Sequence, residues 1–167
     1  MRIPRLVSVL AGGLPCLLAA AVLPAQVVVV DEGIFTISIA GERVGREDFS
    51  IRRNVADGGY IAQGNVLRTE GRSSVVLSTD SAGSPFRFQL ERFVAGRRVE
   101  STSGEYRRGL WSGRSVGPTG ESGREFRLPD VVLAADDGVI HHAWFLLRFL
   151  RGGPQLVLRP RGLVVRP

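Results

Sequence analysis

The stretch from Phe35 to Arg53, with the sequence FTISIAGERVGREDFSIRR, decides the fold class of this chain. Its first five residues alternate apolar and polar side chains, and Phe49 and Ile51 resume the alternation after a tight turn at residues 40–43. Alternation with a period of two places the apolar side chains on one face of a strand. The stretch therefore predicts a β-hairpin with one apolar face.

The same pattern continues on the C-terminal side of this hairpin. Short alternating runs extend to residue 128, and turn residues interrupt them roughly every eight to twelve positions. Asp57-Gly58 is the strongest turn signal, because glycine accepts positive φ in a tight hairpin, and an irregular spacing near Glu91-Arg92 predicts a bulge. We expect a mainly β fold, a strongly curved antiparallel meander, half-barrel or barrel-like, of about eight to ten strands.

The periodicity changes after Asp136. From Val139 to Leu150 the apolar residues follow a helical spacing, so the sequence predicts one amphipathic helix that begins at Gly138 and is capped by Asp137. A short strand over Gln155 to Arg159 follows. We expect the helix to pack on the concave face of the sheet, against the phenylalanines of the strands: Phe35, Phe49, Phe86 and Phe88.

Residues 1–25 are predicted to be a secretory signal peptide. Arg2 and Arg5 form a short positive region, the apolar stretch 6–23 follows, and a small residue precedes the expected cut. A retained membrane anchor is the alternative, because the apolar stretch is close to the shortest that spans a bilayer. With cleavage, residues 26–167 form a single β-rich domain that is exported to the periplasm or cell envelope and has no integral membrane span.

Cysteine usage and charge exclude several functions. Cys16 is the only cysteine and lies in the predicted signal peptide, so the exported domain would have no disulfide, thiolate nucleophile or zinc–sulfur site. The chain has a formal net charge of +6 and no lysine. Its arginines are interleaved with acids, which favours a solvated surface over a nucleic-acid partner. The exception is an arginine-rich tail, for which contact with anionic lipid headgroups is a hypothesis: Arg148, Arg151, Arg159, Arg161 and Arg166.

Two patterns raise the question of catalysis. Residues 113–117 match G-x-S-x-G, which serves hydrolases only as a strand-to-helix turn, and Pro118 disfavours a helix there. His141 and His142 are the only histidines. Adjacent helical residues point about 100° apart, so this pair does not chelate one metal. Spacing selects no carboxylate pair for glycoside hydrolysis from Glu47, Asp48, Glu91, Glu100, Glu105, Glu121 and Glu125. No cofactor or metal is predicted, and a hydrolase that uses Ser115 or His141 is the least favoured function.

The hairpin over Phe35 to Arg53 resembles the opening of exported bacterial domains that are similar to the LolA/LolB lipoprotein carriers. The shared features are a strand, a G-x-x-V-G turn at Gly41 to Gly45, and a second alternating strand. The later order, a meander and then an apolar helical segment, is also similar. The resemblance implies a half-barrel whose concave face holds acyl chains under a helical lid. This chain has one clear helix where the carriers have more, and no functional residue is carried over.

Three functions follow, in order of preference. The first is non-catalytic binding of an apolar ligand, a lipid or acylated molecule, in a cavity between helix and sheet. Its candidate ligand-binding residues are Phe35, Phe49, Phe86, Phe88, Trp144 and Phe145. The second is a filled-core structural or adaptor module that meets a protein partner along a sheet edge. The third, the hydrolase, requires a histidine beside a hydroxyl or carboxylate in a cleft.

Overall fold

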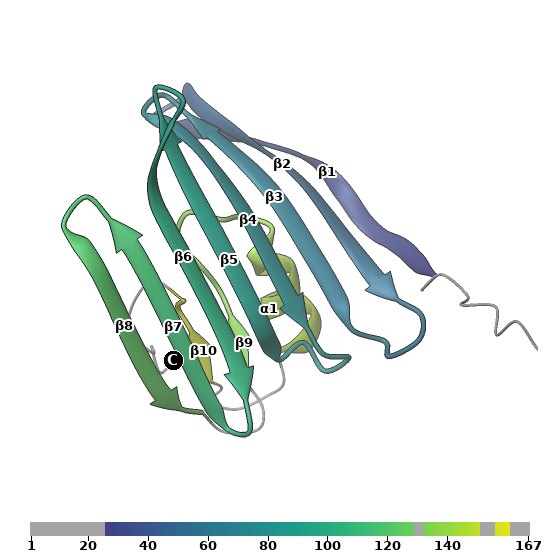
Figure 1. Cartoon of the computed structure of the whole chain (residues 1–167). Helices are drawn as coiled ribbons and strands as arrows, with labels where there is room; N and C mark the ends of the chain where they lie inside the picture. The colour runs from purple at the N-terminus through teal and green to yellow at the C-terminus, as the bar shows by residue number, and fades with distance from the viewer. Residues whose placement is uncertain (1–25, 129–131, 151–155, 161–167) are drawn as a thin grey trace, which may run out of the picture.

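Eight strands pair in chain order into one antiparallel meander that is not closed into a barrel. A computed structural model describes residues 26–128, 132–150 and 156–160, so the predicted signal peptide lies outside the described residues. The sheet is curved (Figure 1), and the predicted mainly β meander is confirmed. Its strands are β1 (Val27–Ile39), β2 (Glu42–Asn54), β3 (Tyr60–Arg68), β4 (Gly71–Thr79), β5 (Pro85–Val94), β6 (Arg97–Arg107), β7 (Leu110–Gly117) and β8 (Gly120–Arg127).

A second layer covers part of one face of the sheet. It consists of the helix α1 (His142–Phe149) and a parallel pair of short strands, β9 (Val132–Ala134) and β10 (Leu156–Leu158). All three lie on the same side of the meander (Figure 1). We call this side, which α1, β9 and β10 cover, the inner face of the sheet. The expectation that one helix packs there is confirmed.

Tight turns with a shared geometry close three of the hairpins. Ala40, Ala95 and Arg108 have φ values of 51°, 49° and 51°, and the glycine that follows each also has a positive φ. Positive φ at both central residues is the requirement of the type I′ turn, whose twist matches that of the strands. The longer turn expected over Gly41 to Gly45 is wrong, because β2 already begins at Glu42 and the irregularity there is a register shift against β1.

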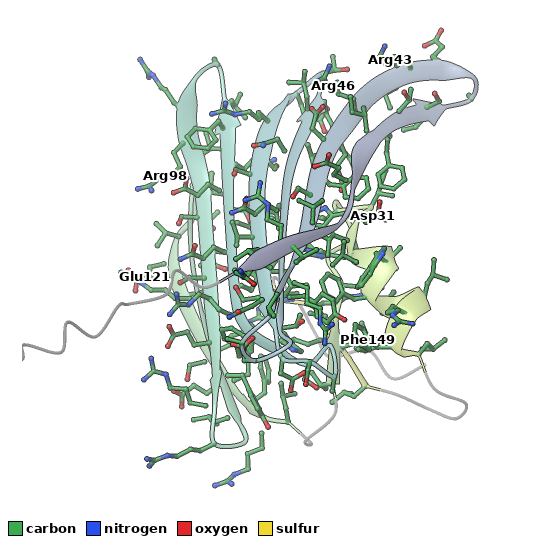
Figure 2. All side chains as sticks on the ribbon, turned by 90° about the vertical axis from the view of Figure 1, so that its right-hand side faces the viewer. Asp31, Arg43, Arg46, Arg98, Glu121 and Phe149 are labelled. Carbon is green, nitrogen blue, oxygen red and sulfur yellow. The ribbon has the colours of Figure 1, made fainter. Side chains whose placement is uncertain are left out.

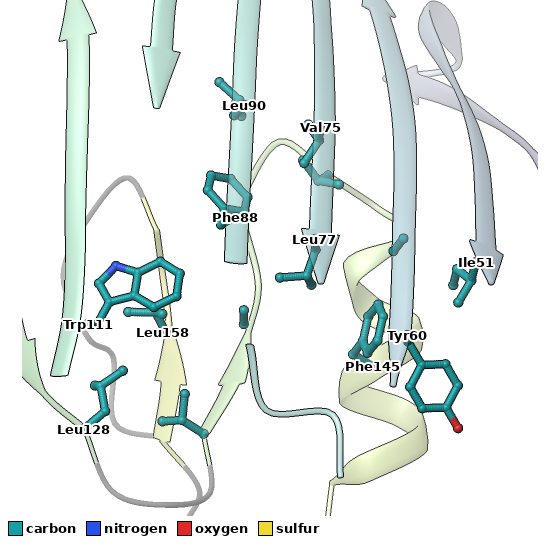
Figure 3. Close-up of a cluster of buried hydrophobic side chains, with 14 residues drawn as sticks. Ile51, Tyr60, Val75, Leu77, Phe88, Leu90, Trp111, Leu128, Phe145 and Leu158 are labelled. Carbon is teal, nitrogen blue, oxygen red and sulfur yellow. The ribbon is translucent and has the colours of Figure 1, made fainter. Parts of the chain in front are cut away.

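One continuous cluster of buried side chains joins the sheet to the second layer (Figure 3). Phe88 of β5, Leu77 of β4 and Ile51 of β2 have no exposed surface, and neither has Phe145 of α1. Trp111 of β7 lies in the same cluster, with 1% of its surface exposed. The contact between α1 and the sheet is therefore filled with side chains of both layers.

Phe86 does not join this cluster, so the prediction that it packs against the helix is wrong. The register of β4 with β5 shifts between Ser78 and Thr79, which pair with Arg87 and Pro85 and leave Phe86 without an opposite residue. Such a bulge breaks the alternation of faces. Phe86 is 46% exposed, whereas Phe88 two residues later is buried. The pairing of β5 with β6 is irregular beside the bulge predicted near Glu91-Arg92, but the extra residue is Val99 of β6, so the bulge lies on the neighbouring strand.

Replacing Phe86 with serine is expected to change the free energy of unfolding by less than about 0.5 kcal/mol, because the side chain lies at the surface outside the core cluster. Urea denaturation followed by circular dichroism measures the change. A loss of more than about 2 kcal/mol would contradict the exposed position, since losses of that size accompany deletion of buried groups.

Candidate functional site

Glu47 is an acid at a position that the strand pattern reserves for apolar side chains. It follows the same alternation on β2 as Phe49 and Ile51, and its side chain is fully buried. Its Oε2 accepts the N–H of Ile140 at 2.7 Å, and its Oε1 accepts the N–H of His141 at 2.8 Å. Oε1 also lies 2.6 Å from Nδ1 of His141. One carboxylate thus holds the residues that lead into α1.

The surroundings of Glu47 favour its charged form. Burial alone would raise the pKa of this carboxyl group. The hydrogen bond with the His141 ring, the two backbone N–H donors and the charge of His141 act against burial and lower the pKa of Glu47 below its ordinary value. A buried charge is tolerated only with partners of this kind, so Glu47 and His141 form a fixed carboxylate–histidine pair.

The start of α1 differs from the prediction. The helix begins at His142 instead of Gly138, and Asp137 does not cap it. Asp136 accepts the Gly138 N–H at 3.2 Å, while Asp137 forms an ion pair with Arg159 at 2.8 Å. A tertiary contact explains this start, because the N–H groups of Ile140 and His141 donate to the Glu47 carboxylate of β2.

The arginine-rich tail is only partly described. Arg148 is exposed at the end of α1, and Arg159 is engaged by Asp137. The remaining members, Arg151, Arg161 and Arg166, lie outside the described residues.

His141 occupies the space above Gly64 of β3. A Cβ atom placed on Gly64 would lie 2.5 Å from Cε1 of the histidine ring, so a residue with a side chain would displace the ring. Gly64 pairs with Phe49 on β2, and Phe49 pairs with Gly33 on β1. The imidazole therefore stands where a side chain of β3 would otherwise stand on the inner face.

Three rings form a row across the strands, which we call the ring row: His141, Phe49 and Phe35. The His141 and Phe49 rings are 6.0 Å apart with 1° between their planes, and the Phe49 and Phe35 rings are 4.8 Å apart with 8° between theirs. The separation of the Phe49 and Phe35 rings matches the spacing of neighbouring strands, about 4.8 Å, and that of the His141 and Phe49 rings is longer. The row runs from His141, which lies above Gly64 of β3, to Phe49 of β2 and ends on β1, where Phe35 is 37% exposed.

His142 fills the core on the other side of His141. It is fully buried, its Nδ1 accepts the Asp136 N–H at 3.1 Å, and its ring meets Phe88 edge-on at 6.2 Å. His141 has a carboxylate within hydrogen-bond reach, as the hydrolase hypothesis requires, but both side chains of the carboxylate–histidine pair are 0% exposed. The pair is part of the packed interior and does not line a cleft.

The G-x-S-x-G string lies inside β7, which pairs with β6 on one side and β8 on the other. Ser115 is half-buried and its hydroxyl is 2.9 Å from that of Thr102. The string is therefore not the strand-to-helix turn that exposes a nucleophile in hydrolases. Among residues 26–128, 132–150 and 156–160, no three histidine or acidic side chains come together as a metal site.

The six predicted ligand-binding residues occupy three different environments. Phe88 and Phe145 are core residues without exposed surface, and Trp144 is half-buried beside Tyr60, with 5.5 Å between the ring centroids. The structure brings Trp144 and Phe145 together on α1, and it brings Phe35 and Phe49 together in the ring row. Phe86 stands apart from both groups.

The two edges of the sheet differ in chemistry. β1 consists mostly of valine and isoleucine, has two acids but no arginine or proline, and exposes Val28 at 54% and Ile34 at 62%. β8 consists mostly of glycine and charged residues. Charged side chains protect an edge strand from pairing with another chain, and a long apolar edge invites pairing. Figure 2 views the sheet from the side of β1, which lies in front with no other described element beyond it.

A hollow of about 790 Å³ lies on the outer face of β5 to β8. Several of its polar side chains pair with one another, such as Arg87 with Glu105 at 3.3 Å and Ser112 with Glu125 at 3.0 Å. Because these groups are paired across neighbouring strands and do not converge on one point, the hollow is the weaker candidate for a binding site.

No family model, no curated protein and no solved structure matches this chain. The resemblance to the lipoprotein carriers therefore stays a prediction. In the part of the chain that the structure describes, no helix is both long enough and apolar enough to cross a membrane.

Proposed function

We propose that this protein is a non-catalytic binding module with a filled core, which recognises an extended polypeptide segment by accepting it as an additional strand beside β1. The observation that carries the proposal is the contrast between the two sheet edges. Glycine and charge protect β8 along most of its length, whereas β1 exposes a long, mostly apolar edge with two acids, Asp31 and Glu32, and without any arginine or proline.

The central part of β1 has the regular geometry that strand addition needs. Asp31 to Ile37 pair with β2 without interruption, from Ile51 to Gly45, and the register shifts lie on either side of this segment. A regular strand presents alternate backbone N–H and C=O groups to its free side. Main-chain hydrogen bonds to such groups supply the affinity in strand addition, and the side chains beside them supply the specificity.

The core supports an adaptor more than a carrier. Side chains of α1 and of the sheet, such as Phe145 and Leu77, meet in one cluster without exposed surface. Binding of a lipid or acylated molecule stays a prediction. Native mass spectrometry of residues 26–167 purified without detergent tests it, through the presence or absence of a stoichiometric apolar ligand.

Lysine at position 34 is expected to abolish strand addition. Ile34 is 62% exposed on the outer face of β1, and a lysine on an edge strand opposes pairing with another strand. Peptides selected from a display library of random sequences on the wild-type protein should bind Ile34→Lys at least about tenfold more weakly. They should also protect backbone amides of residues 31–37 from hydrogen exchange.

The matched control is Leu67→Lys, because Leu67 is also an apolar residue on the outer face, 51% exposed, but belongs to the interior strand β3. Selected peptides should bind this variant as they bind the wild type. Peptides that bind all three proteins equally, or a selection that enriches no peptide, would overturn the proposal.

A further inference from the structure

The ring row and the charged residues of β1 indicate which side chains a strand paired with β1 would carry. Phe35 is the last ring of the row. One face of its ring stacks on Phe49, and Phe35 itself is 37% exposed on the edge strand β1. The row crosses directly from the His141 ring above Gly64 to Phe49, and then runs diagonally to Phe35, because Phe49 pairs with Gly33 on β1 and Phe35 pairs with Glu47 on β2. A further ring in this row would belong to a strand that pairs with the free edge of β1.

The two charged residues of β1 lie four and three positions before Phe35 on the same strand. Asp31 and Glu32 are the only charged residues of the strand. Within the described parts of the chain, neither forms an ion pair. In an extended partner, the residues facing Glu32 and Asp31 are three and four positions away from the residue that faces Phe35. Opposite charges at facing positions stabilise a strand pair, and like charges destabilise it.

We propose that the partner segment carries an aromatic residue facing Phe35 and two basic residues three and four positions away, facing Glu32 and Asp31. This inference rests on the proposed strand addition at β1. The aromatic residue would extend the ring row by one ring, on the inner face of the sheet. The basic residues would neutralise the two acids of the edge. The occupant is thus an extended polypeptide with a basic and aromatic motif.

Two synthetic peptides test the motif in the two possible directions. Val-Thr-Trp-Val-Thr-Arg-Arg places its tryptophan at Phe35 and its arginines at Glu32 and Asp31 in an antiparallel pair. Arg-Arg-Thr-Val-Trp-Thr-Val does so in a parallel pair. We expect one of them to bind the wild-type protein in fluorescence anisotropy and to bind Ile34→Lys at least about tenfold more weakly. Either direction supports the proposal.

Paired substitutions separate direct contact from a structural effect. Phe35→Leu keeps an apolar side chain and removes the ring, and is expected to weaken binding about fivefold. Replacing the peptide tryptophan by leucine should cost about as much against the wild type and almost nothing against Phe35→Leu. Glu32→Arg should weaken the arginine peptide about tenfold, and a peptide with glutamate at the facing position should restore binding.

The outcomes distinguish the motif from strand addition itself. Peptides without the motif that lose affinity for Ile34→Lys, while neither synthetic peptide binds, would overturn the motif and leave strand addition standing. Synthetic peptides that bind Ile34→Lys and the wild type equally would overturn both. A wild-type protein that sediments as a dimer, together with an Ile34→Lys variant that sediments as a monomer, would assign the β1 edge to a second copy of the chain and overturn the motif.

Discussion

Replacing Trp111 with alanine is expected to lower the free energy of unfolding by about 3–5 kcal/mol, the range for truncation of a buried aromatic residue. The indole is 1% exposed and belongs to the cluster that joins the sheet to the second layer. Urea denaturation followed by circular dichroism measures the loss. Trp111→Phe retains a ring in the same place, and should lose less. A loss below about 1 kcal/mol for Trp111→Ala would show that the indole is not a core residue.

Gly104 tests the same packing from the opposite side. A Cβ atom on Gly104 would lie 2.1 Å from Cζ2 of Trp111, so Gly104→Ala forces the indole to move. We expect a loss of about 1–3 kcal/mol in the wild type, and a clearly smaller loss in the Trp111→Ala background. Gly117→Ala is the matched control, because a Cβ atom there has no neighbour within 4 Å. Equal losses in both backgrounds would contradict a direct contact.

Replacing Glu47 with alanine is the second substitution with a large expected effect, a loss of about 3–5 kcal/mol. It removes the acceptor of the Ile140 and His141 amides and leaves the buried His141 ring without its carboxylate. Urea denaturation at about pH 7 measures the loss. Asp48→Ala is the control, since Asp48 forms a part-exposed ion pair with Arg46, which is worth about 0–1 kcal/mol. Similar losses for both variants would contradict the role assigned to Glu47.

The contribution of Glu47 is also expected to depend on pH. Its pKa in the folded protein is lowered, so the stabilisation is complete above the ordinary pKa of a glutamate and is lost as the pH falls through the lowered folded value. The difference in unfolding free energy between the wild type and Glu47→Gln should therefore stay constant from about pH 7 down to the ordinary pKa of a glutamate, and shrink as the pH falls below it. A difference that grows over the same range would reverse the sign of the linkage.

The sheet could be predicted from the sequence because its signals are local. Alternation within each strand and a positive-φ turn such as Ala95-Gly96 need only a few neighbouring residues. The same local signal predicts the wrong position for Phe86. Its alternation with Phe88 is regular in the sequence, and the bulge that turns it outward arises from how Ser78 and Thr79 pair with β5.

The site could not be predicted in this way, because its parts come from distant segments. The helix start depends on Glu47, which lies 93 residues before Ile140. The ring row combines residues of β1, β2 and the segment before α1, and it depends on the missing side chain of Gly64. One signal was present in the sequence: Glu47 is an acid in the apolar register of Phe49 and Ile51. An acid at such a position indicates a buried partner.

The long separation between Glu47 and His141 also constrains the order in which the protein folds. Each hairpin of the meander joins neighbouring strands, so its contacts span short loops whose closure costs little entropy. The contact between β2 and the start of α1 closes a loop of more than 90 residues. The meander can therefore form strand by strand, while the side chains of Ile51, Leu77 and Phe88 are still exposed to solvent. This apolar face is buried only when residues 140–149 pack on it. The packing of these residues therefore controls how long the partly folded sheet is prone to aggregation.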